Sequence, residues 1–162
     1  MKKITAVHLV LLAFFIFPVI GHSAFNEGDP EMTENKEIVT SFFENVTAGD
    51  IDGAFELVSD EVSWWVPGTL PFSGTKTKSE YMAIVGQITK GFPPGFELKV
   101  TGMIEENDQV AAEVISNGTH MNGRQYNNRY HFLIRIKDSK MVDVKEYMDT
   151  LHLHQLIAPK SE

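Results

Sequence analysis

One acidic side chain falls on an otherwise apolar strand face near the C-terminus, and it is the strongest candidate for chemistry in the chain. Val144 and Met148 lie two positions on either side of Glu146, and side chains two apart in a strand share a face. An ionised carboxylate is costly to bury among apolar neighbours unless it is paired or protonated. Perturbed acids of this kind gather at functional sites. The spacing also permits a glutamate that reaches past Met148 into water.

The strand expected before Glu146 adds polar groups to the same face. Tyr126, Asn128 and Tyr130 are spaced two apart, so their side chains should point in one direction. A buried tyrosine usually finds a hydrogen-bond partner, and a carboxylate is an obvious one. We therefore expect these three side chains beside Glu146 as substrate-binding residues, although Tyr126 can equally fill the core.

Helices precede the strands in the expected order of elements. Apolar side chains recur at helical spacing from Thr33 to a stop signal at Gly49, and again after Asp50, which can cap a short second helix. A third helix is expected at residues 78–90. Alternating strands follow, and a last short helix can be capped by Asp149. Helices followed by an antiparallel meander predict an α+β fold.

The N-terminus has the features of a bacterial signal peptide. Lys2 and Lys3 precede an apolar run at residues 9–20, and small residues follow it. An uncleaved membrane anchor is the alternative, but the run is shorter than the ~20 apolar residues of a spanning helix. We expect a signal peptide at 1–24, a flexible start at 25–32, one domain at 33–158 and a tail at 159–162. The mature protein is then periplasmic or secreted, with no stable membrane insertion after cleavage.

Composition excludes several classes of function. The formal net charge is -8, and such an acidic chain lacks the clustered cations that bind nucleic acid. The chain has no cysteine, so disulfides, thiol nucleophiles and thiolate metal sites are absent. His152 and His154 diverge on a helix and cannot share one metal ion. No phosphate loop or dinucleotide fingerprint appears, so we expect neither a metal nor a cofactor.

Three stretches of the chain resemble the SnoaL-like, ketosteroid-isomerase-like branch of the nuclear transport factor 2-like superfamily. They are WWVPGTLPFSG at 64–74, GRQYNNRY at 123–130 and EYMDT at 146–150. The resemblance implies a cone of three N-terminal helices packed on a curved antiparallel sheet, with a short C-terminal helix. It places Trp64 at the pocket, and strand alternation puts Met148 on the same face as Glu146, so we expect both as substrate-binding residues. The superfamily hosts isomerases, cyclases, hydrolases and non-enzymes, so the fold alone does not define an activity.

The resemblance implies a catalytic role at one position of this chain, whereas other catalytic residues of the similar enzymes are missing from it. In members similar to limonene-epoxide hydrolase, the acid at the Glu146 position is catalytic. Those enzymes also need an Arg-x-Asp pair where this chain has Glu113 and Ile115, and a Tyr-x-Asn pair where it has Trp64 and Val66. Epoxide hydrolysis by that route is therefore not expected.

Glu113 is a second candidate acid with conflicting indications. The resemblance places it on the pocket face, whereas Val110, Ala112 and Val114 favour the opposite face. If Glu113 points inward, two acids share one cavity and at least one pKa rises, as in the logic of ketosteroid isomerase. We expect Glu113 to face inward and include it with Glu146 as catalytic.

These observations predict an exported protein with an apolar pocket for a small hydrophobic molecule. Acid/base catalysis of isomerase, cyclase or hydratase type is one reading. A non-catalytic binding protein or an assembly domain of the same fold is the other, because binding needs the same cavity and polar anchor. Members of this fold commonly dimerise through the outer face of the sheet, so we also expect a homodimer.

Overall fold

The computed structural model describes residues 31–158. Residues 32–158 belong to a compact unit that begins at Met32. The expected signal peptide at 1–24, most of the flexible start and the tail at 159–162 lie outside the described residues. Within residues 31–158, no helix has the length and apolar character needed to cross a membrane.

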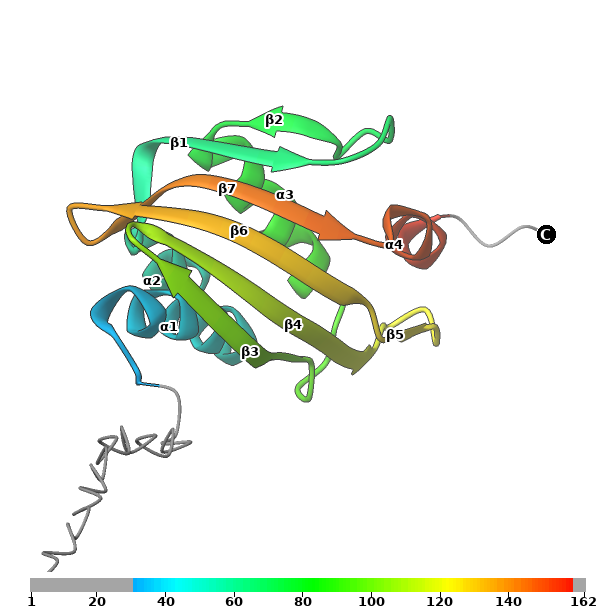
Figure 1. The fold of residues 1–162 in the computed structure, drawn as a ribbon. Helices are drawn as coiled ribbons and strands as arrows, with labels where there is room; N and C mark the ends of the chain where they lie inside the picture. The colour runs from blue at the N-terminus through cyan, green and yellow to red at the C-terminus, as the bar shows by residue number, and fades with distance from the viewer. Residues whose placement is uncertain (1–30, 159–162) are drawn as a thin grey trace, which may run out of the picture. The chain divides into compact units, whose positions relative to one another are not determined.

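Within residues 31–158, two helices come first, two strands and a third helix follow, and five further strands precede a last helix, so helices and a mainly antiparallel sheet make an α+β fold. The elements are α1 (Glu34–Ala48), α2 (Ile51–Glu56), β1 (Val58–Val66), β2 (Gly74–Lys76), α3 (Lys78–Thr89), β3 (Glu97–Glu106), β4 (Gln109–Thr119), β5 (Gln125–Tyr126), β6 (Arg129–Lys137), β7 (Lys140–Met148) and α4 (Thr150–Ile157). The expected fold class is therefore confirmed, although β1 and β2 lie between the second and third helices, and a short helix ends the described residues (Figure 1).

One sheet connects the strands in the order β2-β1-β7-β6-β4-β3, and β5 pairs with β4 (Figure 1). The expectation of an antiparallel sheet is wrong at one pair, because β1 runs parallel to β7. Turn signals report only the pairing of neighbouring strands. β1 finds its partner far along the chain, where Trp64 pairs with Val144, so no local signal could have revealed it.

The expected helix boundaries follow from capping residues. Thr33 accepts a hydrogen bond from the Lys36 amide at the start of α1, and Gly49 ends the helix with a φ of 80°. That left-handed conformation is accessible to glycine at little cost. Asp50 caps α2 by accepting from the Gly53 amide at 2.9 Å.

Helices α1, α2 and α3 pack on the inner face of the sheet (Figure 1). Aromatic side chains fill the space between the two layers. The Trp64 ring of β1 lies 4.0 Å from the Tyr81 ring of α3 and 5.6 Å from the Phe42 ring of α1, measured between ring centroids. Core packing therefore fixes the rings of Trp64 and Tyr81, the two side chains that hydrogen-bond the Glu146 carboxyl.

Candidate functional site

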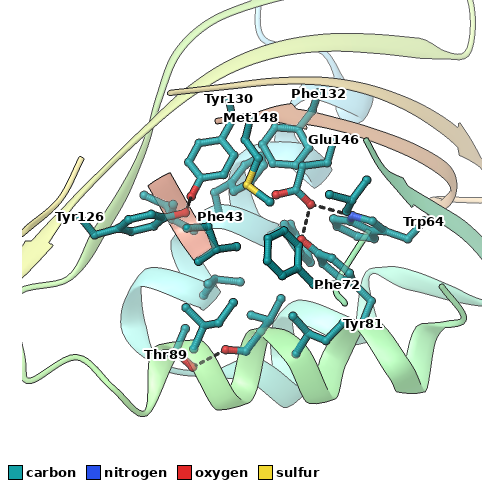
Figure 2. A pocket seen from close by; sticks show the side chains of 18 of the residues that line it. Phe43, Trp64, Phe72, Tyr81, Thr89, Tyr126, Tyr130, Phe132, Glu146 and Met148 are labelled. Atoms are coloured by element: carbon teal, nitrogen blue, oxygen red, sulfur yellow. Dashed lines mark hydrogen bonds between the residues drawn. The ribbon is translucent and has the colours of Figure 1, made fainter. Parts of the chain in front are cut away.

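A cavity of about 80 Å³ lies between the inner face of the sheet and α3 (Figure 2). Its walls are mainly aromatic and aliphatic side chains, including Phe43, Phe72 and Phe132. Phe72 comes from the ordered 67–73 loop, in which the Ser73 hydroxyl donates to the Pro67 carbonyl at 2.8 Å. Among the described residues that line the cavity, Glu146 is the only acid, and none is lysine, arginine or histidine.

The Glu146 carboxyl is buried, with 3% of its surface exposed. Trp64 Nε1 donates a hydrogen bond to Glu146 Oε2 at 2.9 Å, and the Tyr81 hydroxyl donates to the same oxygen. Within residues 31–158, no side chain or backbone group bonds Oε1. Figure 2 shows that this second oxygen turns toward Met148, away from Trp64. One oxygen is thus held by the protein and the other is available.

Burial raises the pKa of Glu146, and the hydrogen bonds from Tyr81 and Trp64 partly oppose that rise. Loss of hydration disfavours the charged form, whereas donors to a carboxylate favour it. Burial, together with the negative charge of Glu146, raises the pKa of Tyr81 well above its ordinary value. Tyr81 therefore remains protonated and acts as a donor, while Glu146 holds its proton at a higher pH than an exposed glutamate.

A pair of tyrosine hydroxyls lies in another part of the cavity wall (Figure 2). The Tyr126 and Tyr130 oxygens are 2.6 Å apart, and burial raises the pKa of Tyr126 to about 12. The pair carries two protons, and the contact between the two oxygens uses one. The second proton is available to a ligand oxygen.

The structure brings together five of the residues expected at the site. Glu146, Trp64, Tyr126, Tyr130 and Met148 all line the cavity. Their expected places are therefore observed, while their catalytic or binding roles stay predictions.

The expectation that Glu113 shares the cavity is wrong. Glu113 is exposed on the outer face of β4, opposite His131 of β6. The buried neighbours Ala112 and Val114 point inward, so strand alternation forces Glu113 outward. The alternation of apolar residues predicted the outward orientation of Glu113 correctly, whereas the residue-by-residue resemblance to the family predicted the wrong side.

Asn128 is also removed from the substrate-binding set. Its Nδ2 donates to the Asp149 carbonyl at 2.9 Å and to the Tyr126 hydroxyl at 3.2 Å. Its Oδ1 accepts from the Arg129 and Asp149 amides. The side chain is absent from the cavity wall and instead joins the ends of β6 and β7.

Tyr81 is the site residue that sequence reasoning missed. Its place on the inner side of the predicted third helix indicated a packing role only. A hydroxyl on a buried helix face needs a partner, which is the same type of signal that singled out Glu146. Applied to α3, that signal would have found Tyr81.

Asp149 has the structural role that the sequence favoured. Its side chain caps α4 by accepting from the His152 amide at 3.0 Å. In the described part of the chain, no cluster of three or more histidine, aspartate and glutamate side chains could hold a metal ion.

Comparison with known proteins places the chain in a family. Residues 39–144 match the sequence profile of the SnoaL-like domain. The chain belongs to the SnoaL-like domain family. No curated protein matches this SnoaL-like chain.

Solved structures share the fold at low sequence identity. A nuclear transport factor 2-like protein of unknown function from Burkholderia pseudomallei is 20% identical, with a TM-score of 0.67 over 79% of this chain and 100% of that one. TerC, co-crystallised with polyporic acid, is 21% identical, with a TM-score of 0.65 over 77% and 98%. IdmH, a proposed polyketide cyclase from Streptomyces antibioticus, is 18% identical, with a TM-score of 0.64 over 77% and 99%. This likeness establishes the architecture.

Proposed function

We propose that this SnoaL-like protein binds a small hydrophobic molecule in its cavity and that Glu146 acts on that molecule as a general acid or base. The observation that carries the proposal is that Glu146, a buried acid in an apolar cavity, has one oxygen, Oε1, that accepts no hydrogen bond from the described residues. Buried acids with perturbed pKa values are common in active sites. TerC, with its bound polyporic acid, is support by analogy of fold.

The geometry suits proton transfer of isomerase, cyclase or hydratase type. A raised pKa lets Glu146 hold a proton closer to neutral pH, where general acid–base catalysis is most effective. The Tyr130 hydroxyl can hydrogen-bond a ligand oxygen on which negative charge develops. With Glu113 outside the cavity, a ketosteroid-isomerase-like pair of acids plays no part in this proposal.

Cavity size limits the ligand. Pockets for drug-sized molecules measure about 300–1,000 Å³, whereas this cavity measures about 80 Å³. A small ligand fits as the cavity stands, and a larger one requires the walls to move apart.

The test is a ligand screen followed by kinetics. Trp64 borders the cavity, so tryptophan fluorescence should report binding. With an identified substrate, we expect Glu146→Gln to lower kcat by about 10²–10⁴-fold. Glu113→Gln removes an acid from the outer face and should keep full activity. Full turnover by Glu146→Gln would refute the catalytic role.

A second candidate is a binding protein without chemistry. No second acid and no basic side chain lines the described cavity wall beside Glu146, and a lone carboxyl can simply anchor a guest. Mass spectrometry of the protein purified from its native source would find an unaltered bound molecule in this case. A product formed from an added molecule would favour catalysis.

Export is part of the proposal. Lys2 and Lys3 with the apolar run that follows support a cleaved signal peptide and a periplasmic or secreted location. The exported protein should begin directly after Ser23 or Ala24 by N-terminal sequencing. An N-terminus at Met1 in the exported fraction would contradict cleavage.

A further inference from the structure

The charge of the cavity wall is unbalanced. Glu146 is the only acid in the described wall, and no cationic side chain lines it. Both oriented donors, Trp64 Nε1 and the Tyr81 hydroxyl, bond the same oxygen. Oε1 therefore faces the cavity without a protein donor or a counter-charge.

Aromatic rings form much of the remaining wall. Phe43, Phe72 and Phe132 lie around the cavity with Trp64 and Tyr130 (Figure 2). Aromatic faces attract cations through the ring quadrupole, more strongly where water is excluded. A carboxyl together with these rings provides two independent attractions for a positive charge, whereas no cationic side chain of the described wall attracts a negative one.

We propose that the ligand of this cavity carries a protonated nitrogen, as a small alkylammonium group. The ammonium donates an N–H to Glu146 Oε1, and its alkyl carbons contact the aromatic rings. This proposal rests on the ligand site proposed above and names the chemical class that the site takes. A carboxylate ligand would place a second negative group beside ionised Glu146 in one apolar space, which is unfavourable, so we expect it not to bind.

The volume of the cavity limits the size of the ammonium group that it can hold. An apolar cavity of about 150 Å³ accommodates benzene, and this cavity is about half that size. It therefore accepts about three to five non-hydrogen atoms. Isopropylammonium has these dimensions as a whole ligand, and a primary ammonium on a short branched alkyl group has them as one end of a longer ligand.

Three probes of similar shape separate the classes. Isopropylammonium and 2-propanol have the same carbon skeleton and differ in charge, and isobutyrate supplies a branched anion. The indole N–H signal of Trp64 in proton–nitrogen NMR reports binding, because that group bonds the Glu146 carboxyl. At neutral pH, we expect isopropylammonium to bind the wild-type protein at least about tenfold more tightly than 2-propanol. Isobutyrate should leave the signal unchanged.

Two variants test whether the preference for the ammonium over the alcohol comes from the Glu146 carboxyl. Glu146→Gln keeps an oxygen that can accept from Trp64 and Tyr81 but removes the negative charge, so the preference for the ammonium over the alcohol should fall by about fivefold or more, with only the attraction of the rings left. Glu113→Gln removes the same charge from the outer face and should keep the wild-type preference. If Glu146→Gln does not fold, the comparison of the three probes on the wild-type protein still tests the proposal.

Four results would overturn the inference. They are equal or tighter binding of 2-propanol by the wild-type protein, binding of isobutyrate, an ammonium preference that Glu146→Gln leaves undiminished, and a Trp64 signal that no probe perturbs. Alcohol binding without an ammonium preference, together with turnover that depends on Glu146, would reject the ligand class and keep the proposed catalysis.

Discussion

At the scale of single residues, the site depends on two donors that hold one oxygen of a buried acid. Glu146 and Trp64 belong to neighbouring strands of the sheet, and Tyr81 reaches the same carboxyl from α3. Strand alternation in the sequence was sufficient to predict an inward Glu146. Strand alternation says nothing of Tyr81, because this residue lies on a helix, and only its hydroxyl on a buried helix face indicated that it needs a partner.

Tyr81→Phe isolates the hydroxyl that donates to Glu146. Loss of one donor to a buried acid should cost about 1–3 kcal/mol of unfolding free energy at neutral pH, while ring packing on Trp64 is kept. Urea unfolding measures this cost. Tyr147→Phe is the matched control, since Tyr147 lies on the outer face with 45% of its surface exposed. Equal stability of the two variants would show that the hydroxyl contributes nothing.

The raised pKa of Glu146 also predicts a pH dependence of stability. The folded state holds this proton more tightly than the unfolded state, so the stability that Glu146 contributes is present below the ordinary pKa of 4.5 and is lost as pH rises through the folded pKa. Glu146→Gln lacks this loss. The unfolding free energy of the variant relative to wild type should therefore rise with pH.

Urea unfolding at several values between about pH 4 and pH 8 measures this difference. Glu113→Gln is the control and should follow the wild-type curve, because its carboxyl is exposed. Parallel curves for Glu146→Gln and wild type would mean that burial does not perturb the acid.

At the scale of elements, local signals in the sequence predicted most boundaries and few long-range partners. Thr33, Gly49 and Asp50 act at the helix ends where capping chemistry indicated them. The parallel pairing of β1 with β7 was missed because it joins strands with no connecting turn. Asn128 was assigned to the ligand because alternation predicts which side a residue faces but not which hydrogen bonds its side chain makes.

Helix α4 is held at its C-terminal end by the turn between β4 and β5. Arg124 donates to the carbonyls of Gln155 at 2.6 Å, Leu156 at 3.0 Å and Ala158 at 2.6 Å. The last carbonyls of a helix have no partner within the helix, and a cation there is favourable. α4 in turn supplies Leu153 to the cavity wall.

Arg124→Ala should loosen α4 and leave the sheet intact. We expect a loss of about 1–2 kcal/mol in unfolding free energy and faster amide hydrogen exchange confined to residues 150–158. Hydrogen exchange followed by mass spectrometry measures this effect. Arg129→Ala, on the exposed outer face, is the control. Unchanged protection of α4 in Arg124→Ala would show that these bonds do not anchor it.

At the scale of the whole molecule, the two faces of the sheet differ. The inner face forms the core and the cavity. The outer face exposes Tyr147 and Ile115 to solvent, at 45% and 37% of their surfaces, and Trp65 packs edge-on against Tyr147. Apolar side chains that contact one another on a surface, as Trp65 and Tyr147 do, often mark an interface. This observation supports the homodimer that we propose.

Light scattering at micromolar concentration should give twice the mass of one chain. Tyr147→Glu should weaken the dimer by about tenfold or more, because it places a charge in an apolar contact. Leu151→Glu is the control, since Leu151 is exposed on α4, away from the sheet. A monomeric mass for the wild-type protein would reject the dimer.

The central claim is that Glu146 is a buried acid with a raised pKa and one oxygen open to the cavity. Carbon-13 NMR of protein labelled at the glutamate carboxyl carbon tests it most directly, with the Glu146 signal assigned by its loss in Glu146→Gln. We predict that this signal titrates with a midpoint above the ordinary value of 4.5 and that isopropylammonium shifts it. A midpoint at or below 4.5 would contradict the account.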